Sequence, residues 1–197
     1  MGQFTFLTTR LEGPCKIEPF FVGDERGCFV KSFERDVFRE HGLDLELQES
    51  FETFSRKGVL RGLHFQRKTP QGKLVRALQG RIFDVAVDLR LDSDTFGQWE
   101  GFLLDDEEHS AVYIPPGFAH GFLVVSETAQ VSYQCTGAFL PQEDTGVIWN
   151  DPDLGVLWPL DLVDGVVLSP RDQALPSLEE CIRTRSLPEQ IKEEVML

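Results

Sequence analysis

The middle of the chain alternates hydrophobic and polar positions with the period of two that is typical of β-strands. The clearest case is "IFDVAVDLR", where two sets of positions alternate: Ile82, Asp84, Ala86 and Asp88 against Phe83, Val85, Val87 and Leu89. Gln79-Gly80 turns the chain just before it, and "AVYIPPGFAHGFLVV" and "AQVSYQCTG" predict further strands. From Ser50 to about Val131, turn signals recur roughly every ten residues, which favours an antiparallel sandwich or barrel.

Helical periodicity occurs only outside this region. In "SFERDVFREHGL" the apolar residues Phe33, Val37 and Phe38 fall on one side, so a helix is predicted with Ser32 as its cap and Gly42 at its end. Near the other terminus, Ser186 and Glu189 have capping-box spacing, which indicates a polar helix over Leu187–Met196. A solvated tail is the alternative interpretation of that segment.

Composition and charge narrow the class of protein. A chain of 197 residues with 41% hydrophobic residues is sufficient for one domain with a buried core. A formal net charge of -14 makes nucleic acid and anionic membranes unsuitable general partners. No apolar run approaches the length of a membrane span, and the start "MGQFTFLTTRLEG" has no signal-peptide pattern, so we expect a cytoplasmic protein.

The cysteines, Cys15, Cys28, Cys135 and Cys181, include no C-x-x-C pair and predict neither a structural zinc site nor a disulfide framework.

One short segment carries an unusual number of cationic side chains for an acidic protein. It is Val59–Gly80, "VLRGLHFQRKTPQGKLVRALQG", with His64 near its centre. Of the other histidines, His41 lies at a predicted helix end and His109 in an acidic loop, which leaves His64 and His120 in glycine-rich strand segments. A local gathering of positive charge on an acidic protein can bind an anionic small molecule.

Metal binding and acid–base chemistry are the two chemical hypotheses for these histidines. A non-haem iron or zinc site needs two or three histidines with a carboxylate, but Phe65-Gln66 follows His64, so there is no H-x-H pair. This argues against a metal. In the acid–base hypothesis His64 removes a proton, Lys73 returns to its neighbourhood on a paired strand to stabilise an oxyanion, and Tyr133 donates a proton. On the residues alone, the alternative that His64 is a satisfied core histidine and Tyr133 a packed strand aromatic stays open and is slightly favoured.

Motifs distributed from about Cys15 to Leu178 resemble the dTDP-4-dehydrorhamnose 3,5-epimerase family. In chain order they are "GDERG", "VLRGLHFQ", "QGKLVR", "IFDVAVDLR", "TFGQW", "YIPPGFAHGF", "WNDPDLGVLWPL" and "LSPRD". The resemblance implies a mainly β, cupin-type antiparallel jelly roll with a few short peripheral helices, without a metal or other cofactor, and usually a homodimer. It implies a single domain over residues 1–178. The tail over 179–197 carries no family motif, and the capping-box spacing described above predicts that it is partly helical.

The same resemblance implies an activity and a set of site residues. Members act on nucleotide-linked 4-keto-6-deoxyhexoses and invert C3, C5 or both. His64 would be the base, with Asp172 orienting it, Tyr133 the proton donor and Lys73 the group that stabilises the enolate. The residues that would bind the sugar, diphosphate and nucleotide are Arg26, Phe29, Lys31, Gln48, Ser50, Arg61, His120 and Arg171.

The sequence departs from the family pattern where the nucleotide would bind. Gly137, Ala138 and Phe139 stand where an asparagine and two tyrosines are usual, and Lys31 stands where a glutamate is typical. Glu49-Ser50 replaces an Asp-Asn pair. The nucleotide and the set of inverted carbons therefore stay open. Double inversion is the preferred hypothesis, a single-centre epimerase is the alternative, and a non-catalytic sugar-nucleotide-binding cupin is the alternative from another class.

Overall fold

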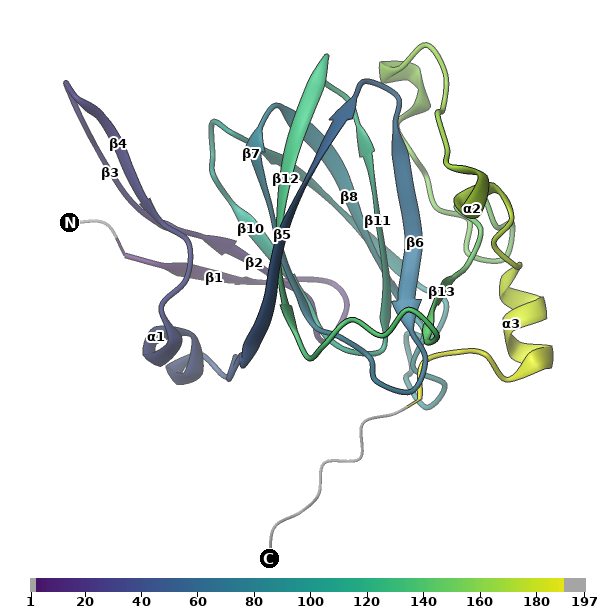
Figure 1. Ribbon diagram of the computed structural model, residues 1–197. Coiled ribbons are helices and arrows are strands. Elements are labelled where there is room, and N and C mark those ends of the chain that lie inside the picture. Colours follow the sequence, from purple (N-terminus) through teal and green to yellow (C-terminus); the bar gives the residue numbers. More distant parts are fainter. Residues whose placement is uncertain (1–2, 190–197) are drawn as a thin grey trace, which may run out of the picture.

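In the computed structural model, which describes residues 3–189, two antiparallel sheets face each other (Figure 1). The six-stranded sheet has the order β1-β2-β10-β7-β12-β5. Its strands are β1 (Thr5–Thr8), β2 (Cys15–Glu18), β10 (Ala111–Ile114), β7 (Lys73–Gln79), β12 (Thr128–Thr136) and β5 (Leu47–Arg56). The five-stranded sheet has the order β13-β6-β11-β8-β9. Its strands are β13 (Asp144–Gly146), β6 (Leu60–Gln66), β11 (Phe118–Val124), β8 (Arg81–Asp88) and β9 (Trp99–Asp105).

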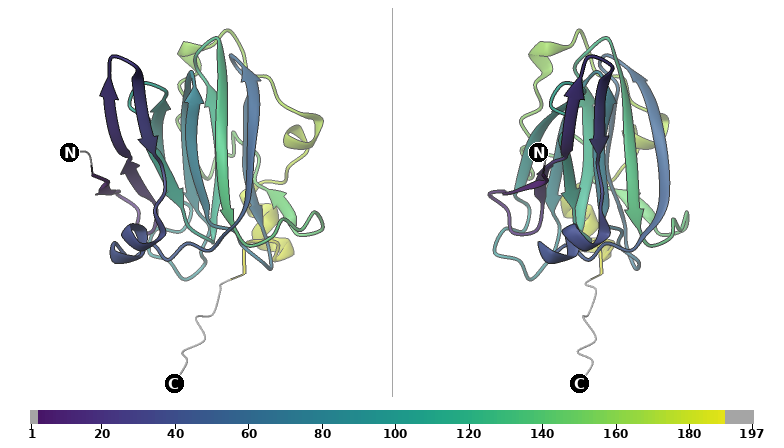
Figure 2. Two further views of the ribbon diagram at one scale, coloured as in Figure 1. Left: turned by 60° about the vertical axis from the view of Figure 1, so that its left-hand side comes forward. Right: turned by 90° about the vertical axis from the view of Figure 1, so that its left-hand side faces the viewer.

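The remaining elements lie around this sandwich. A hairpin of β3 (Phe20–Asp24) and β4 (Gly27–Lys31) extends away from the two sheets (Figures 1 and 2). The helices are short: α1 (Arg35–Glu40), η1 (Leu160–Leu162), α2 (Pro170–Gln173) and α3 (Leu178–Thr184). The predicted mainly β jelly roll with a few short peripheral helices is confirmed.

The chain crosses between the sheets at the predicted turn Gln79-Gly80. β7 ends at Gln79 in one sheet and β8 begins at Arg81 in the other. A side chain at Gly80 would collide with the carbonyl oxygen of Thr128, because a Cβ there would lie 2.0 Å from it, and φ is +72°. Glycine is therefore required at this corner.

Apolar side chains of both sheets form the central core. Val75 and Val131 from the six-stranded sheet pack with Ile82, Ala86 and Phe122 from the five-stranded sheet. The outer face of the five-stranded sheet is also covered, since Val85 and Val87 pack in a second cluster with Trp158, Leu178 and Cys181. Because both faces of β8 are buried, its two aspartates are buried too, and each needs polar partners.

The helix predictions are partly confirmed. A helix does lie within residues 32–42, Phe38 is its buried residue, and Gly42 follows its C-cap with φ +82°. The predicted cap is wrong: the N-cap residue is Glu34, with extended backbone and without a side-chain cap bond. Ser32 lies two residues earlier, outside the turn whose amides need an acceptor.

The C-terminal part differs from the prediction. Helix α3 was not predicted, although Ser177 caps it by accepting from the amide of Glu180. Leu187, Pro188 and Glu189 are not helical, and the rest of the predicted helix over Leu187–Met196 lies outside the described residues. The domain boundary at 178 stays a prediction, while Cys181 and Leu187 pack in the second cluster. Within residues 3–189, no helix has the length and apolar character needed to cross a membrane.

Candidate active site

A cavity of about 250 Å³ opens between the two sheets, on the side where β5 is the edge strand of one sheet and β13 and β6 are the outermost strands of the other. Strands of both sheets contribute to its wall, together with the segment after β12 and helix α2. The lining residues are Glu49, Phe51, Thr53, Arg61, His64, Phe65, Gln66, Gln71, Lys73, His120, Tyr133, Cys135, Phe139, Asp144 and Arg171. Two strands of the five-stranded sheet approach unusually closely here: a Cβ at Gly62 would lie 2.5 Å from the Cα of Gly121. This contact of backbones explains the glycines beside both cavity histidines.

His64 forms a dyad with Asp172. The Nε2 atom of His64 lies 2.5 Å from Oδ1 of Asp172, which is 108 positions away in the sequence. Ser169 caps α2 by accepting from the amide of Asp172, with Pro170 in the first turn, so the carboxylate is held on a defined backbone. Burial alone would raise the pKa of Asp172, but the hydrogen bond and charge of His64 outweigh it and the pKa lies below its ordinary value. An ionised Asp172 orients the imidazole and stabilises its protonated form.

Lys73 reaches this dyad from the opposite sheet. Its Nζ donates to the carbonyl oxygen of His64 at 3.5 Å. The prediction of paired strands is wrong, because β6 and β7 belong to different sheets and the two residues meet across the sandwich. Burial lowers the pKa of Lys73, while the nearby Cys135, Asp144 and Asp84 act in the opposite direction. The weakly hydrated ammonium group of Lys73 can therefore stabilise a substrate oxygen that gains negative charge in the cavity.

Tyr133 lies in the cavity wall on β12. Burial and the charge of Asp84 raise the pKa of its phenol well above the ordinary value, so the hydroxyl holds its proton at neutral pH. The ring of Phe51 stacks on it, with centroids 4.7 Å apart and planes 11° apart. The edge contact with His120 has a centroid distance of 5.6 Å. A protonated donor therefore faces the same space as His64 and Lys73.

A second histidine–carboxylate pair, His120 with Asp84, supports the cavity floor. Nε2 of His120 lies 2.7 Å from Oδ2 of Asp84, and both side chains are buried. Burial lowers the pKa of His120, and the interactions with Asp84 oppose this shift. Oδ1 of Asp84 has no hydrogen-bond partner among the described residues. Sequence reasoning assigned Asp84 no role, although an aspartate within the apolar run "IFDVAV" was a signal that could have identified it.

Two arginines bring positive charge to the cavity. Arg61 donates from Nε to Oγ of Ser55 at 3.2 Å, and Nη2 of Arg171 lies 2.7 Å from Oδ2 of Asp144. The structure brings seven of the predicted site residues together at the cavity. They are these two arginines with His64, Lys73, Tyr133, His120 and Asp172.

The other predicted residues lie away from the cavity of this chain. Gln48 and Ser50 are exposed on β5, and the cavity-facing positions of that strand are Glu49, Phe51 and Thr53. Gln48 and Ser50 therefore lie on the face of β5 that points away from the cavity of this chain. Gln71, which sequence reasoning also missed, donates to Glu49 from Nε2 at 3.2 Å.

The hairpin β3–β4 carries the remaining three predicted residues. Arg26 forms an ion pair with Asp24 at 2.5 Å, and Lys31 forms one with Glu34 at 2.8 Å. Phe29 is 57% exposed. Within one chain, the structure does not bring these side chains to the cavity.

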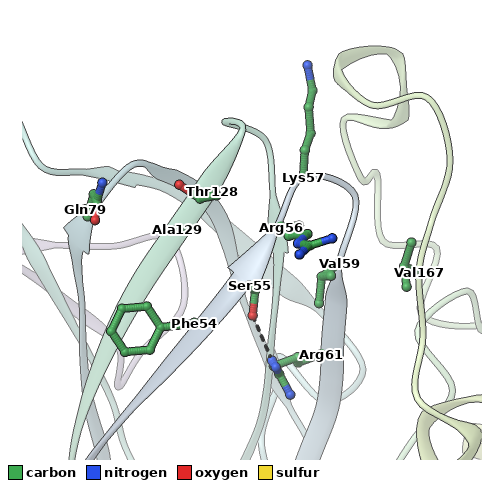
Figure 3. A pocket seen from close by; sticks show the side chains of 10 residues that line it. All are labelled: Phe54, Ser55, Arg56, Lys57, Val59, Arg61, Gln79, Thr128, Ala129 and Val167. Atoms are coloured by element: carbon green, nitrogen blue, oxygen red, sulfur yellow. Dashed lines mark hydrogen bonds between the residues drawn. The ribbon is translucent and has the colours of Figure 1, made fainter.

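A larger hollow of about 710 Å³ lies where β5 ends and β6 begins (Figure 3). Its lining residues are Phe54, Ser55, Arg56, Lys57, Val59, Arg61, Gln79, Thr128, Ala129 and Val167. It contains no histidine, carboxylate or tyrosine, and only Arg61 is shared with the smaller cavity. The acid–base groups are therefore confined to the smaller cavity.

The donor groups of the cavity do not form a metal site. Among residues 3–189, no three His, Cys, Asp or Glu side chains are placed to hold a metal ion. His64 and His120 each bond to a separate carboxylate.

Comparison with known proteins agrees with this geometry. The family model described as dTDP-4-dehydrorhamnose 3,5-epimerase matches residues 8–180. The enzyme of that name from Methanothermobacter thermautotrophicus is 49% identical over 180 residues, covering 91% of this chain and 97% of the relative. The Escherichia coli enzyme is 43% identical over 182 residues, covering 91% and 97%.

Solved structures give the same result. The Legionella pneumophila epimerase in complex with dTDP-4-keto-L-rhamnose superposes with a TM-score of 0.90 at 42% identity, covering 96% of this chain and 100% of that one. A 3'-monoepimerase from Streptomyces bikiniensis in complex with dTDP-quinovose has a TM-score of 0.85 at 34% identity, covering 91% of each chain. With its fold, its cavity and these relatives in agreement, the chain belongs to the dTDP-4-dehydrorhamnose 3,5-epimerase family.

Proposed function

We propose that this protein inverts C3 and C5 of a dTDP-linked 4-keto-6-deoxyhexose without a cofactor. The observation that carries the proposal is the placement of a His–Asp dyad, a half-buried lysine and a protonated tyrosine around one cavity. These are a base, a stabiliser for an oxyanion and an acid, which are the groups that inversion next to a carbonyl requires.

The reaction proceeds through an enolate. The ring nitrogen of His64 that does not face Asp172 takes the proton from the carbon beside the C4 carbonyl, and the bonding electrons move to the carbonyl oxygen. Lys73 stabilises the negative oxygen. Tyr133 then donates its proton to the carbon from the opposite face while the enolate returns to the C4 ketone. His64 releases its proton to solvent, and solvent restores the phenol. The configuration inverts because removal and return of the proton occur on different faces.

The diphosphate binds through Arg61 and Arg171, which lie in the wall of the cavity. Arginine suits this role because its planar, permanently charged group forms paired hydrogen bonds with phosphate oxygens. Of the basic side chains in the segment Val59–Gly80, only Arg61, His64 and Lys73 line the cavity. Arg67 and Lys68 instead pair with Glu143. Phe139, 47% exposed at the cavity, offers a ring against which the base of the nucleotide can stack.

The assembly proposed here is a homodimer in which the hairpin β3–β4 reaches the cavity of the partner subunit. The hairpin extends away from its own sandwich (Figure 1). It exposes Phe21, Val22 and Phe29 by 45%, 43% and 57%. Burial of such an apolar surface against a second copy is favourable. It also gives Arg26, Phe29 and Lys31 a place at a substrate site.

A cytoplasmic location is part of the same proposal. All of the cysteines, Cys15, Cys28, Cys135 and Cys181, are free thiols in the structure. Free thiols suit a reducing compartment.

Proton NMR of dTDP-4-keto-6-deoxyglucose with the protein in deuterated water tests the function. We expect deuterium to enter at both C3 and C5, with inversion at each carbon. His64→Asn is expected to lose at least about a hundredfold of the exchange rate, the usual effect of removing a general base. Absence of exchange by the folded wild-type protein would refute the proposal.

The same measurement separates the second candidate, a single-centre epimerase. The similarity to the Streptomyces bikiniensis 3'-monoepimerase, with a TM-score of 0.85, favours keeping this candidate. Deuterium at C3 alone, or at C5 alone, would establish it.

A further inference from the structure

The ring of Phe51 occupies an unusual place in the cavity wall. Phe51 lies on β5 directly opposite Tyr133 in the ladder with β12, and the two rings stack 4.7 Å apart at 11°. Phe51 is 45% exposed, whereas Tyr133 is 7% exposed. The exposed ring of Phe51 therefore covers one face of Tyr133 on the side toward solvent.

The other aromatic neighbours of Tyr133 come from the opposite sheet. His120 meets the ring at 73° with a centroid distance of 5.6 Å, and Phe122 lies 6.5 Å away at 47°. These two residues are fixed in β11 and buried. Phe51 lies on an edge strand and is the only one of the three that faces the cavity mouth. Its ring is thus placed to restrict both the tilt of the phenol and the access of water to it.

This arrangement matters for the reaction proposed above, on which the present inference rests. Once the enolate exists, its carbon can take a proton from Tyr133, which inverts it, or regain one from the base side, which exchanges the hydrogen without inversion. Water that enters the cavity also competes as a proton source. A small change in the position of the hydroxyl therefore changes the partition between these outcomes.

We propose that Phe51 is a positioning residue for Tyr133: its ring fixes the phenol and excludes water, so that protonation of the enolate produces inversion. It takes no proton and does not react. Its effect lies on the second half of the reaction, after His64 has removed the proton.

The test compares Phe51→Ala with Phe51→Tyr, which keeps an aromatic ring, and with Phe54→Ala as the matched control. Phe54 lies on the same strand, is 71% exposed and points to the other side of β5 from Ser55 and Arg61 (Figure 3). The quantity measured is the ratio of inverted to non-inverted product among the molecules that have gained deuterium, at early times in deuterated water. Each variant is first checked for wild-type thermal unfolding.

For Phe51→Ala we expect this ratio to fall about tenfold while the rate of deuterium entry changes less, since a well-placed acid contributes roughly a hundredfold or more. Phe51→Tyr and Phe54→Ala should keep the wild-type ratio. If Phe51→Ala does not fold, Phe51→Leu, which removes the ring but keeps much of the volume, takes its place.

Two results would overturn the inference alone: an unchanged ratio in the ring-less variant, or an equal loss of exchange and inversion, which a purely structural role would give. Absence of exchange by the wild-type protein would overturn the proposed function and this inference with it.

Discussion

Replacement of Asp172 by asparagine is the sharpest perturbation of the base. The variant keeps the size of the side chain and removes only its charge and one acceptor. In the native protein the carboxylate is 2.5 Å from His64 and 4% exposed, so the interaction is largely shielded from water. We expect the first step, removal of the carbon-bound proton, to be the step that slows.

The magnitude follows from the interaction that is lost. A hydrogen bond to a charged group contributes about 1.5–3 kcal/mol, and at about 1.4 kcal/mol per factor of ten this predicts a loss of roughly 10- to 150-fold. A wrongly oriented or wrongly protonated ring adds to this loss, as in other histidine–carboxylate dyads. We therefore expect exchange in Asp172→Asn to fall by about a hundredfold or more.

The assay is the initial rate of deuterium entry into saturating substrate, read by NMR. Asp161→Asn is the control, because Asp161 is an exposed carboxylate of η1 in the same C-terminal part of the chain and its loss changes the net charge equally. The rate of deuterium entry in Asp161→Asn should equal that of the wild type. Exchange in folded Asp172→Asn within about threefold of the wild type, a change in barrier well below 1.4 kcal/mol, would show that the carboxylate does not support the base.

Three further outcomes follow from the same structure. Tyr133→Phe should retain deuterium exchange while inversion falls by about a hundredfold, the usual contribution of a positioned acid; undiminished inversion would move that role to another group. Activity should survive prolonged dialysis against a strong chelator, and elemental analysis that found a metal needed for activity would contradict this. Because the pKa of Asp172 is depressed in the folded state, its stabilising effect is present above the unfolded value near pH 4 and is lost as the pH falls through the folded value. The free energy of unfolding, measured with urea, should accordingly fall less in Asp172→Asn than in the wild type when the pH is lowered below about 4. If it fell equally in both proteins, the depressed pKa of Asp172 would be contradicted.

The fold and part of the site could be predicted from the sequence because some signals are local. Alternation in "IFDVAVDLR" and the closely spaced turns predict antiparallel strands, and glycines flank His64 and His120. The register of β5 could not be settled in this way. A shift of one residue exchanges the two faces of a strand, and Gln48 and Glu49 are both polar. Phe51 was therefore missed as a cavity residue.

The periodicity of the sequence could not predict contacts between distant segments of the chain. Only resemblance linked Asp172 to His64, since the contact depends on where α2 lies against β6. The path of the chain from β6 to β7 was misjudged because a short connection suggests paired strands, while this one crosses the sandwich and places Lys73 opposite His64. The apolar run around Asp84 marks it as an unusual position, but its partner His120 lies in β11 and cannot be found from the local pattern.

In the proposed mechanism, the four-residue helix α2 makes catalysis depend on a part of the chain that the two sheets do not contain. It lies in the C-terminal segment that covers the outside of the five-stranded sheet (Figure 1), and short peripheral segments open at a lower free-energy cost than central strands. Each such opening would withdraw Asp172 from His64 while the sandwich stays folded. The fraction of molecules that are active can therefore be smaller than the fraction that are folded. The N–H of Asp172 donates to Ser169, so its hydrogen exchange measures the free energy of this local opening.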